Sequence, residues 1–229
     1  LEYLRDVSGK KKAPFFRVGR DFRYRTTQHG LYYRGRRWSL GPLKLGLLGR
    51  FQGRNAALAL GALEILEKVG FKISPQAVEQ GLKHTRWPGR LQLFSEDPLL
   101  VLDGAHNPAA MKALVECIRE EFQYHRLIVV LGVMEDKDIR AMVKSIAPFA
   151  HHMIYSRPAY SRAAEPERLF REGLGLHASA EVIVSLADAL KQARAMAQKR
   201  DLVLICGSLF TVGEALSLLD PKSYPPERP

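Results

Sequence analysis

The sequence has few cysteines and no long hydrophobic run. Its 229 residues include two cysteines, Cys117 and Cys206, and each lies in an apolar pattern without a paired motif. This predicts buried free thiols and a reducing, cytoplasmic compartment. No segment approaches the roughly 18 apolar residues that cross a bilayer, and residues 1–12 lack the apolar core of a signal peptide. We therefore expect no membrane partner.

Acidic residues are scarce near the N-terminus. Residues 1–54 carry 14 Lys or Arg but only 3 Asp or Glu, whereas the rest of the chain carries 21 of each, so this quarter holds the whole net charge of +11. Such an excess attracts anions: nucleotide phosphates, a polycarboxylate or nucleic acid. A solvated basic face is the simpler interpretation. Aromatic residues alternate with the charges in a period of two, as in half-buried antiparallel strands.

The histidines also give little indication of a site for metal. Their spacing is not that of metal ligands, and we predict no metal site within this sequence. This applies to His84, His125, His151, His152 and His177.

The first part of the chain predicts short strands followed by helices. Strands are expected at 15–18, 22–26, 31–34 and 43–48. A helix over 55–69 ends at Gly70, and Ser74 caps a second helix that begins at Pro75 and runs to about 82.

A Pro-Gly break at 85–90 marks a domain junction, which predicts domains 1–86 and 87–229. Beyond it, strands and helices alternate, which predicts an α/β domain with a mostly parallel sheet. Strands are expected at 91–94, 99–102, 127–131, 152–155, 181–184 and 202–206, and helices at 109–122, 139–146, 165–172, 186–198 and 209–218.

A strand, a polar turn and a helix follow one another at 102–108 (LDGAHNP). Ligands bind at the carboxyl ends of strands in open α/β sheets. Asp103 and His106 are suited to hold hydroxyls and phosphates there, and the positive N-terminus of the next helix points to the same place. Asn107 is expected to cap that helix, with Pro108 at its first position.

Five motifs occur in order and together resemble one family. They are LGRFQGRNAALAL (48–60), WPGRLQ (87–92), LDGAHNP (102–108), GVMEDKD (132–138) and CGSLFTVGEA (206–215). The set resembles the Mur ligase superfamily, most closely its folylpolyglutamate synthase/dihydrofolate synthase branch. The resemblance implies a Rossmann-like C-terminal glutamate ligase domain at 87–229. It also implies that residues 1–86 are the C-terminal part of a central ATPase domain.

The resemblance further implies a cytoplasmic, monomeric ligase of folate biosynthesis and one-carbon metabolism. It would use ATP and Mg²⁺ to join glutamate to a folate, with no nucleic-acid partner. A folate carboxylate would take the γ-phosphate of ATP, and the glutamate amine would attack the resulting acyl phosphate. Arginine, lysine, Mg²⁺ and helix N-termini stabilise such anionic transition states.

The family's site residues carry over position by position. Asn55 resembles the adenine contact, although its place also suits a helix N-cap. Arg90 resembles a phosphate contact, because a guanidinium holds two oxygens at once. Asp103 resembles the ribose-hydroxyl acceptor, and a turn-forming aspartate is the alternative.

Three further residues resemble groups that meet the reacting parts. His106 would face the γ-phosphate or acyl phosphate. Lys137 would meet the carboxylate of the incoming glutamate and act in catalysis, or it is a solvated lysine in an acidic loop. Ser208 would donate to glutamate, or it caps the last helix.

One family element is missing. No G-x-x-x-x-G-K-[ST] phosphate loop occurs, since Leu4 stands five positions before Gly9, and Phe51 stands where a histidine is usual. We therefore expect a truncated chain that is inactive alone, with the magnesium ligands mainly in the missing part. Two alternatives stay open: a ligase for another acceptor such as a peptidoglycan precursor, and a basic α/β module that binds without catalysis.

Overall fold

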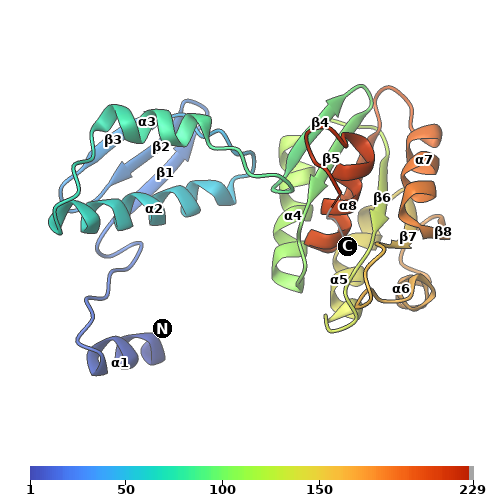
Figure 1. Cartoon of the computed structure of the whole chain (residues 1–229), viewed down its shortest axis with the longest axis horizontal. Helices are drawn as coiled ribbons and strands as arrows, with labels where there is room; N and C mark the ends of the chain where they lie inside the picture. The colour runs from blue at the N-terminus through green and yellow to red at the C-terminus, as the bar shows by residue number, and fades with distance from the viewer. Residues whose placement is uncertain (227–229) are drawn as a thin grey trace. The chain divides into compact units, whose positions relative to one another are not determined.

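The computed structural model describes residues 1–226 and divides the chain into two compact units, Leu1–Arg86 and Trp87–Pro229 (Figure 1). The first unit begins with α1 (Glu2–Lys10), which the sequence analysis did not predict. This helix buries no residue, and an Asp6–Lys10 ion pair one turn apart supports it. Within residues 1–226, no helix has the length and apolar character that crossing a membrane requires.

The first unit contains a three-stranded antiparallel sheet in the order β1-β2-β3. Its strands are β1 (Arg23–Thr27), β2 (Gly30–Arg34) and β3 (Ser39–Leu43). Leu31 and Tyr33 on β2 are buried beneath Leu60 of the helix α2 (Phe51–Lys68). The sheet and α2 therefore share one small hydrophobic core.

Two predicted strands of this unit are wrong. Residues 15–18 form no strand, because Arg17 N–H donates to the Asp21 carboxylate at 2.9 Å and the chain turns back there. The strand expected at 43–48 ends at Leu43 and begins at Ser39. The observed strand β3 contains Pro42, and it lies at the sheet edge, where a missing N–H is tolerated.

Helix α2 begins four residues before the predicted start. The added first turn includes Gly53, although glycine weakens a helix interior. A side chain does not fit at Gly53, since an added Cβ would lie 2.4 Å from Thr26 Oγ1. The helix ends as predicted at Gly70, whose φ is +104°. As expected, Ser74 caps α3 (Pro75–His84) by accepting from Ala77 N–H at 3.1 Å.

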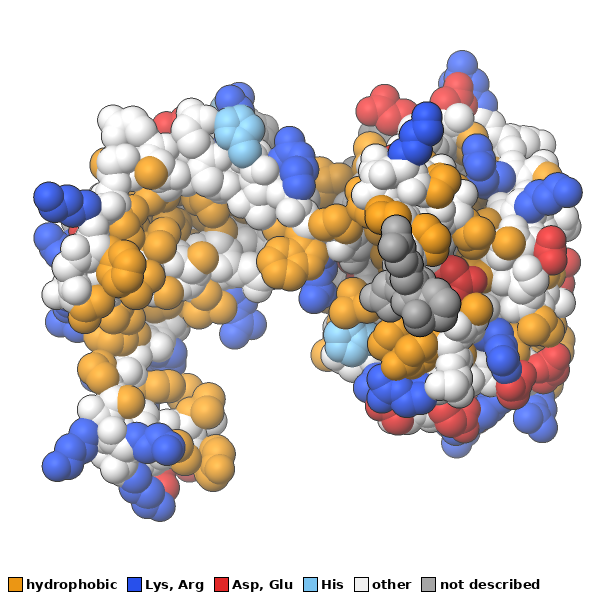
Figure 2. All heavy atoms as spheres, viewed as in Figure 1, with side chains coloured by type: hydrophobic (Ala, Val, Ile, Leu, Met, Phe, Trp, Pro, Cys, Tyr) orange, Lys and Arg blue, Asp and Glu red, His pale blue; other side chains and the backbone are white. Residues whose placement is uncertain are grey.

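The solvent-exposed surface of the first unit is partly apolar. Leu58, Leu66 and Val69 on and just after α2 are 45, 39 and 69% exposed. Figure 2 shows hydrophobic side chains gathered over this unit.

The second unit is an α/β domain around a six-stranded sheet in the order β4-β5-β9-β6-β7-β8. Only β4 is antiparallel to its neighbour, so the predicted, mostly parallel sheet is confirmed. The strands are β4 (Gln92–Glu96), β5 (Leu99–Asp103), β6 (Leu127–Leu131), β7 (His152–Arg157), β8 (Ala180–Ser185) and β9 (Leu202–Cys206). All six agree with the predicted strands to within two residues at each end.

Five helices cover this sheet: α4 (Pro108–Glu121), α5 (Ile139–Ile146), α6 (Pro166–Gly173), α7 (Leu186–Met196) and α8 (Leu209–Leu219). The crossovers through α4, α5 and α6 all move toward β8, and the one through α7 returns to the middle of the sheet. Right-handed crossovers in opposite directions place their helices on opposite faces. Accordingly, α7 and α8 pack together with Val130, Val203 and Ile205 of the sheet (Figure 1).

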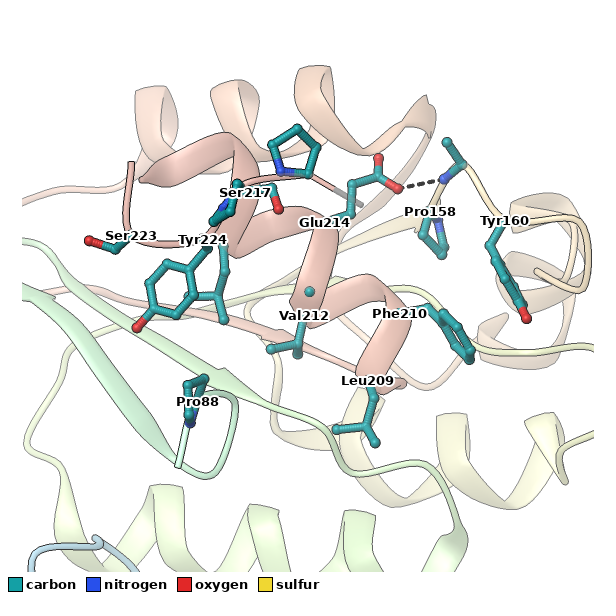
Figure 3. A pocket seen from close by; sticks show the side chains of 15 residues that line it. Pro88, Pro158, Tyr160, Leu209, Phe210, Val212, Glu214, Ser217, Ser223 and Tyr224 are labelled. Atoms are coloured by element: carbon teal, nitrogen blue, oxygen red, sulfur yellow. Dashed lines mark hydrogen bonds between the residues drawn. The ribbon is translucent and has the colours of Figure 1, made fainter. Parts of the chain in front are cut away.

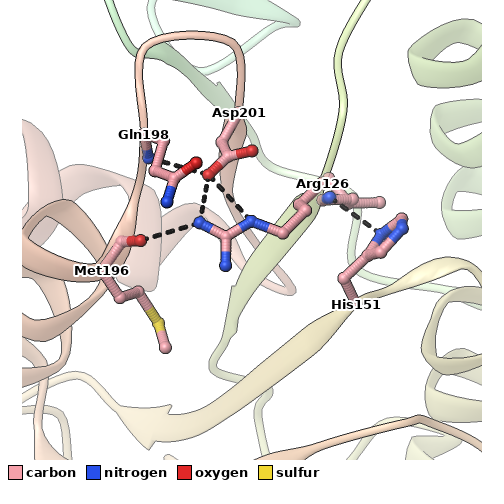
Figure 4. Close-up of polar contacts among 6 residues, drawn as sticks. Arg126, His151, Met196, Gln198 and Asp201 are labelled. Carbon is pink, nitrogen blue, oxygen red and sulfur yellow. Dashed lines mark hydrogen bonds and ion pairs between the residues drawn. The ribbon is translucent and has the colours of Figure 1, made fainter.

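A polar network joins two strands at the end of the sheet where β6 and β9 begin. Asp201 Oδ2 accepts from Arg126 Nε at 3.0 Å, from Arg126 Nη2 at 2.5 Å and from Gln198 N–H at 2.7 Å (Figure 4). Arg126 also donates to the Met196 carbonyl, and Leu127 N–H donates to His151 Nδ1. These bonds hold the start of β6 against the turn that leads into β9.

Candidate functional site

The predicted site residues of the second unit lie at the carboxyl ends of three adjacent parallel strands. Asp103 on β5 pairs with Cys206 on β9, and Cys206 pairs with Leu131 on β6. The loops that follow these strands therefore leave the sheet at one level. They carry His106 after β5, Ser208 after β9 and Lys137 after β6.

Each of these loops leads into a helix whose N-terminus lies at this edge. Asn107 caps α4 by accepting from Ala110 N–H at 2.9 Å, and Pro108 is its first residue, as predicted. Asp138 caps α5 in the same way, and Ser208 caps α8. Three helix N-termini at one edge favour bound anions through their free N–H groups and dipoles.

Asp103 is a buried carboxylate that organises the loop before β4. It is 5% exposed, and its Oδ2 accepts from Leu91 N–H and its Oδ1 from Ala105 N–H, both at 2.8 Å. Burial raises the pKa of Asp103 above its usual value, although these N–H groups and the charges of Arg90 and His106 oppose the rise. The turn-forming role left open by the sequence is therefore present, and each oxygen keeps a lone pair for a further donor.

Arg90 is brought to Asp103 by this loop. Gly104 N–H donates to the Gly89 carbonyl at 2.8 Å, which joins the two loops, and Leu91 adopts a φ of +44° beside them. The Arg90 side chain is half-buried, and its guanidinium has no hydrogen-bond or ion-pair partner within residues 1–226. A buried aspartate and an arginine whose charge lowers the pKa of that aspartate are thus joined through these two loops.

The neighbouring His106 has a fixed ring orientation. Its Nδ1 lies 2.9 Å from the Gly104 carbonyl, which can only accept, so Nδ1 carries the proton. Nε2 is the nitrogen that remains for a ligand. It accepts when the ring is neutral and donates when the ring is protonated.

Lys137 lies in a loop of alternating charge. Its ammonium is 2.7 Å from Asp136 Oδ2, and this contact is the main reason that the pKa of Asp136 is lowered. Glu135, at the start of the loop, pairs with Arg168. The ion pair with Asp136 matches the acidic-loop interpretation, and no contact in the structure tests the carboxylate-binding role.

Ser208 is a buried cap within a hydroxyl chain. It is 2% exposed, and its Oγ accepts from Thr211 N–H and lies 2.9 Å from Thr211 Oγ1. Thr211 Oγ1 donates to the Gly132 carbonyl at 2.8 Å, so the Ser208 proton points to Thr211. The capping role is confirmed. To donate to glutamate, the Ser208 hydroxyl would have to give up its hydrogen bond to Thr211 Oγ1. Thr211 escaped the sequence analysis, although its place three residues after a capping serine was a usable signal.

Asn55 belongs to the first unit and lies within α2, not before it. The N-cap alternative is wrong, because Arg50 holds the cap position and Asn55 stands in the second turn. Its Nδ2 donates to Gln52 Oε1 at 2.9 Å. Both amides line a cavity of about 200 Å³ whose other walls are Leu45, Leu47, Ala56, Ala59, Leu82 and Thr85. A small apolar slot with amide groups at its edge suits a flat base, and Gln52 was not predicted as part of it.

Metal ligands do not gather in either unit. Across residues 1–226, no three His, Cys, Asp or Glu side chains form a group able to hold a metal ion. Cys117 and Cys206 are both buried, as predicted, and neither forms a disulfide within residues 1–226.

The α/β fold, with the loops that Gly89 and Gly104 join at the sheet edge, defines the class of protein to which the chain belongs. The family described as "Mur ligase, glutamate ligase domain" matches residues 89–209, which is more than half of the chain. The chain belongs to this family.

Its relatives include folate enzymes. It is 35% identical over 226 residues to the "Probable bifunctional folylpolyglutamate synthase/dihydropteroate synthase" of Halobacterium salinarum, which covers 94% of this chain and 26% of that protein. It is 33% identical over 220 residues to the dihydrofolate synthase/folylpolyglutamate synthase of Escherichia coli, covering 95% of this chain and 49% of that protein.

The structure agrees with these relationships. It superimposes on E. coli FolC in complex with DHPP and ADP with a TM-score of 0.86 at 28% identity, covering 97% of this chain and 51% of that one. The chain therefore spans about half or less of the length of these relatives. The predicted resemblance and fold class are confirmed.

Proposed function

We propose that this chain supplies nucleotide-binding and glutamate-binding residues to an ATP-dependent ligase that adds glutamate to a folate. One observation carries the proposal: Arg90, whose guanidinium has no hydrogen-bond or ion-pair partner within residues 1–226, precedes the residue that bonds buried Asp103, at the sheet edge where α4, α5 and α8 begin. Family membership and the names of the relatives support the same reaction class.

We assign residues 1–86 to the C-terminal part of the central ATP-binding domain and residues 87–229 to the glutamate ligase domain. The first part contains no G-x-x-x-x-G-K-[ST] motif in this sequence. Backbone N–H groups of such a loop cradle phosphates, and its lysine reaches the β- and γ-phosphates. We therefore expect residues 1–229 to lack catalytic turnover when they are assayed alone.

Each unit, taken by itself, offers groups suited to part of a nucleotide. When bound, ATP would supply the phosphoryl group that activates the folate carboxylate as an acyl phosphate. Asn55 and Gln52 offer amide donors and acceptors at the edge of the 200 Å³ slot, which suits adenine. The planar Arg90 fork can hold two phosphate oxygens. The free lone pairs of Asp103 can accept a ribose hydroxyl.

His106, Lys137 and Ser208 would act on the reacting groups. His106 would present Nε2 to the transferred phosphate, because Nδ1 is held by Gly104. Lys137 would exchange Asp136 for the glutamate carboxylate, and Ser208 would position the same substrate from the start of α8. Acidic side chains for Mg²⁺ are not grouped within residues 1–226, so we derive no step through a metal ion.

The proposal is tested by nucleotide binding and by turnover of the purified chain. ADP binding should be weak, with a Kd of roughly 1 mM or about −4 kcal/mol. Replacing the bidentate fork by Arg90→Lys should weaken it about fivefold. The matched control Arg140→Lys, at an exposed arginine near Glu172, should leave it unchanged.

Turnover is measured as ADP release with ATP, glutamate and a reduced folate, and we expect none above background. Robust release would refute the requirement for a G-x-x-x-x-G-K-[ST] phosphate loop. ADP binding that is equally strong in the Arg90→Lys variant would refute the phosphate-contact role.

A further inference from the structure

A cavity of about 660 Å³ in the second unit contains none of the residues assigned to the proposed function. It lies between α8, the loop that follows β7 and residues 223–226 (Figure 3). Small-molecule sites commonly measure roughly 300–1,000 Å³ and combine apolar walls with a few placed polar groups. This cavity has both properties.

The cavity has aromatic rings in its walls, and other contacts fix the orientation of these rings. The rings of Tyr160 and Phe210 stack with centroids 3.9 Å apart, and the Arg162 guanidinium lies 5.4 Å from the Tyr160 ring centroid. Tyr224, on the other side of the view in Figure 3, accepts a hydrogen bond from Gln92 Nε2 at 3.2 Å. Aromatic walls that other contacts already fix lose little freedom when a flat ring packs on them.

Among residues 1–226, Glu214 is the one acidic side chain that lines the cavity. Its Oε2 accepts from Ala159 N–H at 2.6 Å, which orients the carboxylate, as Figure 3 shows. The side chain is half-buried and has no Lys, Arg or His partner within residues 1–226. A carboxylate at the wall of a cavity, without a cationic partner, favours a ligand that brings N–H donors.

We propose that this cavity binds a fused ring carrying a 2-amino-4-oxopyrimidine edge. That edge presents a ring N–H and an amino N–H in parallel, which match the two oxygens of one carboxylate. The faces of the fused rings would pack on the aromatic and proline walls. Pterins and guanine share this chemistry. A pterin source rests on the proposed function, because it is the head group of a folate, whereas a guanine source does not.

The test is a set of equilibrium titrations of residues 1–229 with pterin, lumazine and guanosine. Lumazine has the pterin ring shape with a carbonyl in place of the 2-amino group, so it turns an acceptor toward Glu214. Pterin should bind at least tenfold more tightly than lumazine, since a site built around an N–H donor rejects the analogue that lacks it. Guanosine tighter than pterin assigns the site to guanine, and the reverse order assigns it to a pterin.

Variants test whether the preference for pterin over lumazine depends on the Glu214 carboxylate. Glu214→Gln, which keeps an oxygen for Ala159 N–H, should bring pterin and lumazine to within about threefold of each other. The control Glu116→Gln changes an exposed acid on α4 and should keep the full preference. Phe210→Ala should weaken the binding of both pterin and lumazine.

A second readout does not depend on any variant. The amide resonance of Ala159 should shift on pterin addition, because it shares Glu214 with the ligand. Equal affinity for pterin and lumazine, an unmoved Ala159 resonance, or no binding of pterin or guanosine at millimolar concentration would each overturn the proposal. ADP binding and its response to Arg90→Lys are measured separately, so the failure of one proposal is distinguishable from the failure of the other.

Discussion

Replacing Asp201 by asparagine should destabilise the second unit by removing one charge at the start of β6 and β9. The Asp201 carboxyl is 2% exposed, and one of its oxygens accepts three hydrogen bonds, two from Arg126 and one from Gln198 N–H. Hydrogen bonds to a charged group contribute roughly 1.5–3 kcal/mol each. Because Arg126 is 41% exposed, solvent screens much of the pair, and asparagine keeps one acceptor oxygen. We expect a loss of about 2 kcal/mol at pH 7.

The loss should depend on pH in a defined direction. Burial by itself would raise the pKa of Asp201, but the Arg126 guanidinium and the backbone N–H groups outweigh it and lower the pKa below its usual value. An acid with a lowered pKa in the folded state stabilises the fold above its unfolded pKa of about 3.9. That contribution disappears as the pH falls through the folded pKa. The wild type and Asp201→Asn should therefore converge in acid.

The assay is urea unfolding at pH 7 and in a series below pH 4, with hydrogen exchange of β6 and β9 peptides to report on this unit. Asp97→Asn is the matched control, because Asp97 lies 3.5 Å from Lys199 Nζ and both side chains are exposed, so its loss should stay below about 0.5 kcal/mol. An equal loss for Asp201→Asn at both ends of the pH range, or a loss no larger than the control, would refute the reasoning.

Two further substitutions test buried polar groups. Glu64→Gln should destabilise the first unit by about 2 kcal/mol, read from Trp38 fluorescence during urea unfolding, because this 4% exposed carboxylate accepts three backbone N–H groups of the β2–β3 turn. No change would mean that water replaces these bonds. Ser208→Ala should lower the unfolding free energy of the second unit by about 1–2 kcal/mol, since it removes a buried cap and strands the Thr211 N–H. Ser185→Ala, at the exposed cap of α7, should cost less than Ser208→Ala.

The two units differ in how well their sequence patterns predict structure. In the second unit the central strands β5, β9 and β6 are short, almost wholly apolar runs, so local pattern and tertiary burial agree there. In the first unit β3 contains Gly41 and Pro42, and α2 contains Gly53 near its start. Those residues are tolerated only because of a sheet edge and of a close contact with Thr26, neither of which local sequence reveals.

The site shows the same division. Asp103, His106 and Arg90 follow from motifs and from the rule that ligands bind beyond strand ends. Their hydrogen bonds depend on contacts across the fold, such as Leu91 N–H to Asp103 and Thr211 to the Gly132 carbonyl. Motif matching names a residue but cannot tell which of its lone pairs or protons the protein already uses.

The sequence by itself determined the α/β class of the second unit, the order of its elements, the family and the identity of the candidate site residues, because periodicity and motif spacing are local properties of the chain. Tertiary structure decided that β9 lies between β5 and β6, and this brings loops more than a hundred residues apart to one level of the sheet. It alone decided that the Arg90 guanidinium has no hydrogen-bond or ion-pair partner within residues 1–226, that the Ser208 hydroxyl has two contacts, and that Glu214 lines a cavity. Burial and hydrogen-bond satisfaction arise only when distant segments pack together.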